Sequence, residues 1–426
     1  MAKSILIVGA GAKAAAIAAK HRALLESEFE VPDITVIEKH EVSANWNGRF
    51  GYTDGIHNLG TPPEKDIGFP YRLDYFDAKV IRYLFSHFSW QSFCIEKRCD
   101  YGDWIDRGKQ HPNHETWSEY LAWVLGRSNV ELFANTTIEK ITQKDGRWKV
   151  SFKNSNRNRE EYFDGIVFTG PGPAKHLGIE FPLHPSVLDG ASYWQNTYRL
   201  AALQEQVAPV VIVGGGETAA SIASSILDET RNKNIPIIIL TRSGTIFSRG
   251  EGYYENRMFT DPERWRTLDI DVRREVIRRG DRGVFSVDAL QKISHSQRIE
   301  HINGAVSGID IDQPENLINL QLSNGTTVQC QMLVMSVGFD NYWFRDLFSE
   351  SVSEKFFDRS NTNAIEENLL EDTSVDFTKP PFNEAEEYPR LHLPMSAALA
   401  QGPGLPNLSC LGTLSDLILR RYCRAG

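Results

Sequence analysis

The feature that most restricts the fold is a glycine-rich loop near the start of the chain, between a short apolar strand and a helix. Residues 4–8 (SILIV) are apolar and mostly β-branched, Gly9, Gly11 and Ala14 follow, and an alanine-rich helix is expected to run to about Leu25. In such a unit the first glycine makes a tight turn and the second lets the backbone approach a pyrophosphate. The small third residue lets the helix pack on the strand.

A second expected strand follows this helix at residues 33–37 and ends in Glu38. A carboxylate at that place can accept hydrogen bonds from a ribose. Strand, loop, helix, strand and terminal acid together predict dinucleotide binding; a plain buried strand–turn–helix is the alternative.

The same pattern recurs in the middle of the chain. An apolar strand at 210–213 leads into a loop that contains Gly214, Gly216 and Thr218, and a helix is expected to about Asp228. We therefore expect these three loop residues to contact a second nucleotide, whose pyrophosphate would lie at the positive end of the helix.

The strand after this second helix, expected at 235–240, is followed by Arg242 rather than by an acid. An arginine there can pair with a 2′-phosphate, which predicts NADPH rather than NADH; a solvated surface arginine is the alternative. Glu217 lies close to the proposed pyrophosphate, and the sequence offers no physical reason for a negative charge at that position.

Two such loops predict an α/β protein with two Rossmann-like domains, an FAD-binding domain and an NADPH-binding domain inserted into it. Expected strands at 164–170 and 331–337 each end at glycine and bracket the second unit. We predict an FAD-binding domain at 1–200, an NADPH-binding domain at 201–338, and the C-terminal part of the FAD-binding domain at 339–426. Two independent, sequential Rossmann domains are the alternative.

Charge and hydropathy exclude several classes of protein. The chain has 46 Lys and Arg against 56 Asp and Glu, a formal charge of -10, and no dense basic block, which disfavours nucleic acid as a partner. It has no run of the roughly 18 apolar residues that a membrane span needs. We expect a cytoplasmic protein that acts on small molecules.

The five cysteines are too few and too scattered for a disulfide framework or a structural metal site. Cys94 and Cys99 alone have the spacing of the redox pair in flavin disulfide reductases, but they lie among charged residues far from the first loop. An ordinary pair of thiols is the favoured interpretation.

Five further segments fall in a characteristic order along the chain. They are 44–48 (ANWNG), 60–70 (GTPPEKDIGFP), 117–123 (WSEYLAW), 254–262 (YENRMFTDP) and 407–416 (NLSCLGTLSD). Segment 117–123 has apolar and aromatic residues at helical spacing, which by itself predicts the buried face of a helix. With the two nucleotide loops, the five segments resemble the class B flavin monooxygenases that hydroxylate primary amines, most closely the mycobactin-type lysine N6-hydroxylases. The resemblance covers nearly the whole chain.

This resemblance assigns roles to individual residues. Trp46 corresponds to a flavin contact, and Lys65 and Asn256 correspond to residues that hold the carboxylate of the amino-acid substrate. Gly412, Leu414 and Ser415 correspond to the closing flavin segment, in which a strand ends in glycine and a helix begins, with Ser415 or Thr413 as its cap. Taken without the family, Lys65 reads equally well as a surface charge and Asn256 as a turn residue.

The resemblance implies that NADPH reduces FAD, that O2 adds to give a C4a-hydroperoxyflavin, and that the distal oxygen passes to a neutral amine in siderophore or related hydroxamate biosynthesis. Because the flavin supplies the oxygen, we assign no side chain, His57, His87 and His111 included, a catalytic role. A disulfide reductase, an NADPH oxidase, a non-catalytic nucleotide-binding protein, and hydroxylation of ornithine or a diamine remain open. So does assembly as a homo-oligomer.

Overall fold

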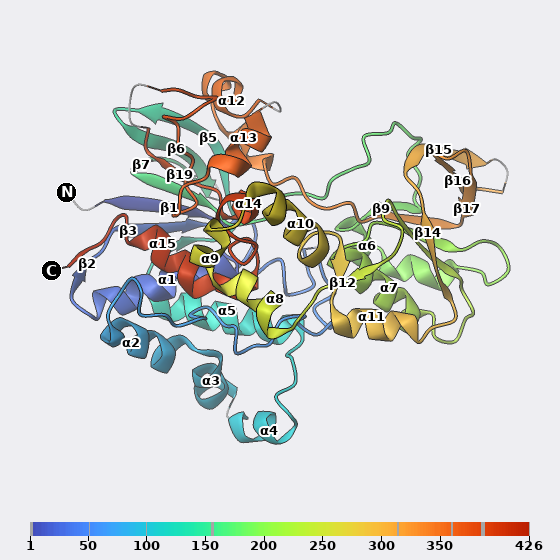
Figure 1. The fold of residues 1–426 in the computed structure, drawn as a ribbon, viewed down its shortest axis with the longest axis horizontal. Coiled ribbons are helices and arrows are strands. Elements are labelled where there is room, and N and C mark those ends of the chain that lie inside the picture. Colours follow the sequence, from blue (N-terminus) through green and yellow to red (C-terminus); the bar gives the residue numbers. More distant parts are fainter. Residues whose placement is uncertain are drawn as a thin grey trace.

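The structure is a computed structural model that describes residues 3–50, 52–98, 100–154, 157–312, 315–358, 361–384 and 388–425. Within these residues the chain forms two parallel sheets of five strands each. Figure 1 shows the first sheet on the side of the two termini and the second towards the other end of the long axis.

The first sheet is built around the N-terminal strand. Its order is β19 (Arg390–His392), β8 (Gly165–Phe168), β1 (Ser4–Val8), β3 (Asp33–Ile37) and β4 (Glu131–Phe133), and all neighbours are parallel. Residues 5–8 are buried, as expected of a central strand covered on both faces. The predicted strands at 4–8 and 33–37 are confirmed, and the one expected at 164–170 is present over a shorter stretch.

The second sheet repeats this arrangement. Its order is β14 (Ile299–Asn303), β11 (Ile237–Thr241), β10 (Val210–Val213), β18 (Met332–Met335) and β9 (Val187–Asp189), again with parallel neighbours. The predicted strands at 210–213, 235–240 and 331–337 are therefore present, the last two with shifted ends.

The chain leaves the first sheet, completes the second and then returns. Strand β19 joins the first sheet beside β8, although the end of β8 (168) and the start of β19 (390) are 222 positions apart in the sequence. Strand β9 pairs with β18, so the second sheet includes a strand that precedes residue 201. In two independent, sequential Rossmann domains, all strands of one sheet would come from one continuous stretch of chain. The observed route differs from that arrangement.

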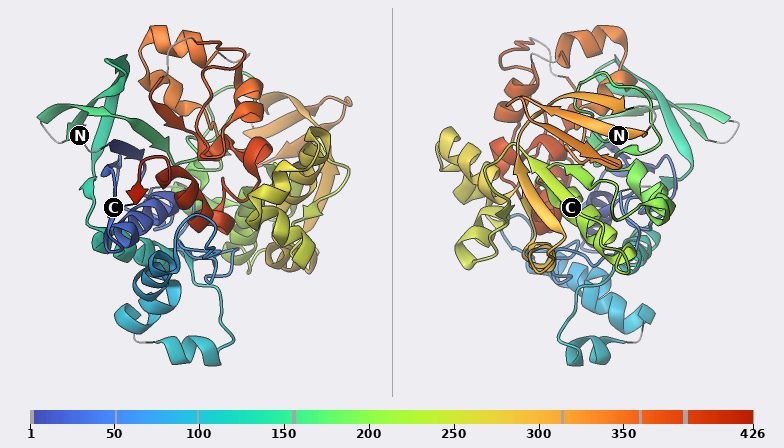
Figure 2. Two further views of the ribbon diagram at one scale, coloured as in Figure 1. Left: turned by 60° about the vertical axis from the view of Figure 1, so that its left-hand side comes forward. Right: turned by 90° about the vertical axis from the view of Figure 1, so that its right-hand side faces the viewer.

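Helices cover the sheets and connect the two halves. Helix α1 (Ala12–Leu25) packs against α5 (His114–Ser128) and α15 (Leu411–Leu419), while α7 (Glu217–Glu229) and α11 (Val287–Ser294) lie against each other at the second sheet. The remaining α-helices are α2 (Ala78–Phe88), α3 (Trp90–Phe93), α4 (Tyr101–Asp106), α6 (Ser192–Gln195), α8 (Tyr253–Thr260), α9 (Pro262–Arg266), α10 (Ile270–Gly280), α12 (Glu350–Phe356), α13 (Thr362–Asn368) and α14 (Ala398–Gln401). In Figure 2, α2 to α4 project from the lower edge in both views.

The group α8 to α10 belongs to the second unit in sequence but packs on the C-terminal part of the chain. Trp265 donates its indole N–H to the carbonyl of Leu399 at 3.0 Å. The Arg273 guanidinium donates to the carbonyls of Leu399 and Ala400 at 3.4 and 3.2 Å. Figure 1 shows these helices in the middle of the view, and the right-hand view of Figure 2 shows them at one side of the sheets. Their hydrogen bonds to Leu399 and Ala400 bring residues of the second unit against the C-terminal part of the chain.

Four smaller sheets among the described residues complete the fold, three of them antiparallel and the β12–β13 pair parallel. The strands β5 (Thr136–Lys144), β6 (Arg147–Asn154) and β7 (Arg157–Phe163) form one sheet, and β15 (Val306–Asp312), β16 (Leu317–Leu322) and β17 (Thr327–Cys330) another. Strand β12 (Phe247–Ser248) pairs with β13 (Val284–Phe285), and β2 (Phe29–Glu30) pairs with β20 (Arg424–Ala425) near the C-terminus. No described helix has both the length and the apolar character that crossing a membrane requires.

A buried ion pair joins the first helix to the last. Lys20 Nζ lies 2.5 Å from a carboxylate oxygen of Asp416, and the two side chains are 0% and 3% exposed. Burial raises the pKa of the Asp416 carboxyl, and Lys20 opposes that rise. Because both groups are buried, each charge is stabilised by the other, and this pair fixes how α15 lies on α1.

We predict that Lys20→Met lowers the free energy of unfolding by about 3–5 kcal/mol, because it leaves the Asp416 carboxylate buried and unpaired. Denaturant titration measures the loss, and the double variant Lys20→Met/Asp416→Leu should recover most of it. As a control, Lys79→Met removes an exposed ion pair with Glu28 and should leave stability nearly unchanged. Equal effects of Lys20→Met and Lys79→Met would contradict the assignment.

Candidate functional site at the two nucleotide loops

The first glycine loop has the shape that a pyrophosphate needs. Gly9 has a φ of +96°, and a Cβ there would lie 2.7 Å from Thr169 Oγ1. Gly11 is the N-cap of α1, and a Cβ there would meet nothing within 4 Å. Ala14 is fully buried. Open space therefore lies beside the positive end of α1, where the main chain can be approached closely.

Glu38 stands at the end of β3 as predicted and holds the same loop. Its two carboxylate oxygens accept hydrogen bonds from the backbone N–H groups of Ala10 at 2.9 Å and His40 at 2.8 Å. A contact between Glu38 and a ribose stays a prediction. What the geometry adds is that this carboxylate is already fixed at the lip of the loop.

The segment with Trp46 lies against the first loop. The N–H of Ser43 donates to the carbonyl of Ala10 at 3.0 Å, and the half-buried Trp46 ring meets the His114 ring edge-on with centroids 5.0 Å apart. His114 lies in the first turn of α5, whose Trp117, Tyr120 and Leu121 are buried as the apolar spacing predicted. Trp46 thus has a defined position next to the glycine turn.

The second loop repeats the geometry of the first. Gly214 has a φ of +142°, and a Cβ there would lie 2.2 Å from the carbonyl oxygen of Ser336. Gly216 is the N-cap of α7, and the nearest atoms to a Cβ there are 3.9 Å away. Thr218 is half-buried in the first turn of α7, and Arg242 is exposed directly after β11. The expected positions for nucleotide contacts are therefore accessible at the carboxyl edge of this sheet.

Glu217, which the sequence left unexplained, caps the start of a neighbouring helix. One carboxylate oxygen accepts the backbone N–H of Ser286 at 2.7 Å and the other accepts the Ser286 hydroxyl at 2.9 Å. Ser286 is the N-cap of α11. The negative charge of Glu217 is thus directed to the positive end of α11 rather than to the nucleotide loop.

The two predicted substrate anchors meet each other. Lys65 Nζ donates to the side-chain oxygen of Asn256 at 2.8 Å across 191 residues of sequence. The amide nitrogen of Asn256, in α8, also donates to the carbonyl of Glu251 at 2.6 Å. Burial lowers the pKa of the Lys65 ammonium, the nearby Arg249 lowers it further, and Glu251 opposes both. The structure therefore brings together a cation and an amide from opposite halves of the chain.

Asp66 holds the loop that presents Lys65. This completely buried carboxylate accepts hydrogen bonds from the backbone N–H of Gly68 at 3.0 Å, the Tyr71 hydroxyl at 2.7 Å and the backbone N–H of Trp90 at 2.9 Å. Burial raises the pKa of Asp66 to about 6, and these donors limit the rise. The adjacent Lys65 and Asp66 have separate tasks, since Asp66 points into the core and Lys65 towards Asn256.

The closing segment differs from the expected strand followed by a helix. Residues 408–410 form a short 3-10 helix that leads directly into α15, so the expected strand is absent from this described segment. Ser415 and Thr413 lie inside α15 rather than at its start, and Ser415 donates to the carbonyl of Gly412 at 2.7 Å. Neither is a cap, and that expectation was wrong.

Gly412 is nevertheless placed beside the loop that carries Lys65. The N–H of Gly412 donates to the carbonyl of Phe69 at 2.7 Å, and a Cβ on Gly412 would lie 2.0 Å from the carbonyl oxygen of Gly68. Leu414 is fully buried, and the buried Thr413 hydroxyl has no hydrogen-bond partner among the described residues. Only glycine fits where α15 touches this loop.

Sequence reasoning missed a second cation near Lys65. The Arg249 guanidinium stacks on the Phe259 ring, 4.3 Å from its centroid, and the Arg249 backbone N–H donates to the carbonyl of Phe285 at 2.7 Å. Its side chain also approaches the Ser409 hydroxyl at 3.5 Å. Arg249 precedes Asn256 by seven residues in an irregular stretch, where residue spacing carries no signal of side-chain direction.

The alternative redox site receives no support from the described residues. Cys94 is buried, and burial raises the pKa of its thiol to about 12, the reverse of what a reactive thiolate needs. Cys99 lies outside the described residues. Among the described residues no three His, Cys, Asp or Glu side chains gather into a metal-binding group.

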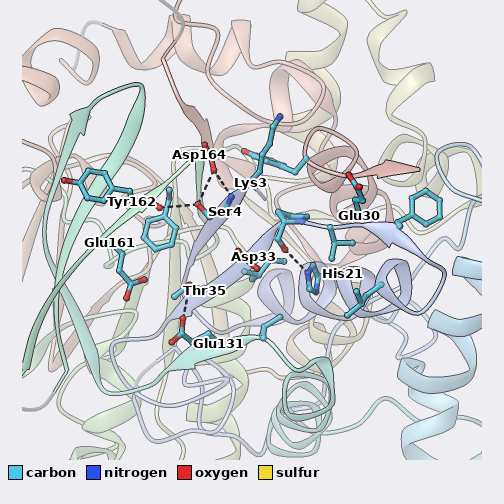
Figure 3. Close-up of a pocket in the computed structure, with 18 of the residues that line it drawn as sticks. Lys3, Ser4, His21, Glu30, Asp33, Thr35, Glu131, Glu161, Tyr162 and Asp164 are labelled. Atoms are coloured by element: carbon cyan, nitrogen blue, oxygen red, sulfur yellow. Dashed lines mark hydrogen bonds between the residues drawn. The ribbon is translucent and has the colours of Figure 1, made fainter. Parts of the chain in front are cut away.

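A hollow of about 1380 Å³ lies at the end of the first sheet opposite to the glycine loop, where strands β1 and β3 begin. Its lining includes Ser4 and Asp33, the first residues of β1 and β3, and His21 on α1, as Figure 3 shows. Both glycine loops follow the carboxyl ends of their strands. This hollow is therefore separate from the candidate nucleotide sites.

Two parallel sheets that each carry a glycine loop before a helix define the class of proteins with paired Rossmann-like nucleotide domains. The family L-lysine 6-monooxygenase/L-ornithine 5-monooxygenase matches residues 82–335. Together with a relative that is 34% identical over 98% of the chain, this match shows that the chain belongs to that family.

That relative is the L-lysine N6-monooxygenase MbtG of Mycolicibacterium paratuberculosis, of which 95% is covered. The lysine monooxygenase NbtG of Nocardia farcinica is similar in structure, with a TM-score of 0.79 and 33% identity over 98% of this chain and 99% of that one. The ornithine N-hydroxylase KtzI of Kutzneria shares the fold, with a TM-score of 0.74 at 16% identity, over 98% of each chain.

We predict that Gly412→Ala lowers the free energy of unfolding by about 1–3 kcal/mol, because the new methyl group would overlap the Gly68 carbonyl and push α15 away. Gly126→Ala is the matched control: this exposed glycine inside α5 has open space around it, so alanine should stabilise the protein by roughly 0.5–1 kcal/mol. Thermal and denaturant unfolding measure both. A neutral Gly412→Ala would disprove the close contact.

Proposed function

We propose that this chain hydroxylates the N6 amine of L-lysine, with FAD and NADPH as cofactors and O2 as co-substrate. The reaction supplies a hydroxylamine for siderophore or related hydroxamate biosynthesis. The observation that carries the proposal is the hydrogen bond between Lys65 and Asn256, because it joins a cation and an amide of opposite halves at a single point. A simple NADPH oxidase has no use for such a pair.

The chain has a suitable cradle for each cofactor. Gly9, Gly11, Ala14, Glu38 and Trp46 would hold FAD at the start of α1, with Gly412, Leu414 and Ser415 of α15 closing over it. Gly214, Gly216, Thr218 and Arg242 would hold NADPH. The open space beside Gly11 and Gly216 supports both assignments. When bound and reduced by NADPH, FAD activates O2, and the protein supplies position and exclusion of water.

The substrate must enter as a neutral amine in order to attack oxygen. The lysine side-chain amine has an ordinary pKa of about 10.4, so an apolar site beside the flavin is needed to favour its deprotonated form. Binding the substrate by its opposite end keeps the charged anchoring residues away from that apolar site. Lys65 and Asn256 would take the α-carboxylate and leave the amine free to reach the flavin.

Arg249 adds to this carboxylate site. It lies close enough to Lys65 to lower the pKa of the lysine ammonium, and its guanidinium is held in place by the Phe259 ring. Two neighbouring cations repel each other until an anion lies between them, so a substrate carboxylate would relieve that repulsion. A diamine lacks this group, which favours an amino acid as the substrate.

The remaining assignments follow from this function. The FAD-binding domain would comprise residues 1–200 and 339–426, except for β9, which pairs in the second sheet, and the NADPH-binding domain at 201–338 would be inserted between them. Reduced thiols and a need for NADPH fit a cytoplasmic enzyme. A homo-oligomer fits as well, and size-exclusion chromatography with light scattering tests it.

An amine panel tests the function directly. The protein, with FAD added, is given NADPH and L-lysine, L-ornithine, cadaverine or an α-N-acyl amide of lysine, and NADPH consumption and hydroxylamine formation are measured together. We expect tight coupling of the two only for L-lysine. If every amine gives NADPH oxidation without hydroxylamine, the protein is an oxidase and the monooxygenase assignment is overturned. If only ornithine or only cadaverine gives coupled turnover, that amine is the substrate in place of L-lysine.

We predict that Lys65→Met raises the KM for L-lysine by about ten- to a hundredfold, because it removes a charge-assisted hydrogen bond to the carboxylate. The kcat should change much less, since this contact is the same in the ground and transition states. Lys109→Met, which removes an exposed partner of Glu64 from the same region, is the control and should leave KM unchanged. Should Lys65→Met alter kcat alone, the anchor role is wrong.

We predict that Arg242→Ala raises the KM for NADPH by about ten- to a hundredfold and leaves the KM for NADH almost unchanged, because only NADPH carries the 2′-phosphate that the guanidinium would bind. Initial rates with each cofactor measure the ratio. Equal increases for both would show that Arg242 does not recognise the 2′-phosphate.

A further inference from the structure

Lys13, in the first nucleotide loop, has a buried side chain whose ammonium group finds no partner among the described residues. It is the second residue of α1, two positions after the N-cap Gly11, and only 8% of it is exposed. Among the described residues none forms a hydrogen bond or an ion pair with its ammonium group within the usual distances, and burial lowers the pKa of that group to about 8.

A second lysine on the same helix shows that this condition is unusual. Lys20 follows Lys13 by seven residues, two helical turns, so both lie on one face of α1. Lys20 is completely buried and has Asp416 at 2.5 Å. The described part of the chain therefore supplies a counter-charge for Lys20 and none for Lys13.

The location makes the missing counter-charge costly. Lys13 lies in the first turn of α1, where the unsatisfied backbone N–H groups already create a positive potential. A cation is disfavoured there, and burial adds the loss of hydration. Side chains in helices lean towards the N-terminus, and for Lys13 this is the direction of the glycine loop.

We propose that Lys13 is the counter-charge for the pyrophosphate of FAD, an assignment that rests on the proposed function, which puts FAD in the first loop. The pyrophosphate would bring negative charge to the point where an unpaired ammonium and a helix N-terminus meet. Lys13 then adds charge recognition to a loop whose glycines offer only backbone N–H groups. It is a binding residue and takes no part in oxygen transfer.

The test compares Lys13→Met with Lys20→Met in FAD-free protein and in FAD binding. Lys13→Met should leave the thermal midpoint of the FAD-free protein unchanged or raise it, since it removes an unpaired charge. In a fluorescence titration it should lower the affinity for FAD by about ten- to a hundredfold. Lys20→Met should instead lower the midpoint of the FAD-free protein. Lys13→Arg should retain most of the FAD affinity.

A titration with ADP locates the contact. ADP contains the two phosphates but no isoalloxazine, so Lys13→Met should weaken ADP and FAD by similar factors. An unchanged FAD affinity, a loss confined to FAD, or a fall in FAD-free stability as large as that of Lys20→Met would each overturn the proposal. If the wild-type protein binds ADP but not FAD, the proposed function fails instead, and the two failures are thus distinguishable.

Discussion

The hydrogen bond between Lys65 and Asn256 is the contact on which this account depends, because it can form only if the two halves of the chain are held in one arrangement. Asp66 accepts the hydrogen bonds that hold the loop with Lys65. Asn256 lies in α8, which packs with α9 and α10 over the C-terminal segment. A second contact, Arg72 with Asp261 at 3.7 Å, crosses the same boundary. The site is therefore a property of the assembled fold and of neither half alone.

Charge at helix ends organises the rest of the site. The first turns of α1 and α7 offer backbone N–H groups to two nucleotides, and a carboxylate at either place would compete with phosphate. Glu217 avoids this competition, since its carboxylate accepts hydrogen bonds from the backbone N–H and the hydroxyl of Ser286 at the start of α11. Glu38 follows β3 and accepts the backbone N–H of Ala10, so it orders the first loop from outside the first turn of α1. The negative charge that seemed out of place in the second loop thus orders α11 without opposing the cofactor.

Sequence patterns predicted what depends on local geometry. Both glycine loops and their strands follow from short-range rules of turn and pleat, and the apolar spacing around Trp117 correctly predicted a buried helix face. Contacts between distant residues could not be predicted in this way. The Lys20–Asp416 pair and the Glu217–Ser286 cap join residues whose separation in sequence carries no signal. The strand before Gly412 was expected only from the family resemblance, whereas residues 408–410 form a 3-10 helix that leads into α15, where Gly412 contacts the Gly68 carbonyl.

The most direct test of the central claim is a crystal structure of the protein with FAD, NADP and L-lysine. The account predicts that the lysine carboxylate lies within hydrogen-bond distance of both Lys65 Nζ and the Asn256 amide, with the N6 amine directed at the flavin. The claim would be contradicted if Lys65 and Asn256 still bonded only to each other while the lysine carboxylate was held elsewhere.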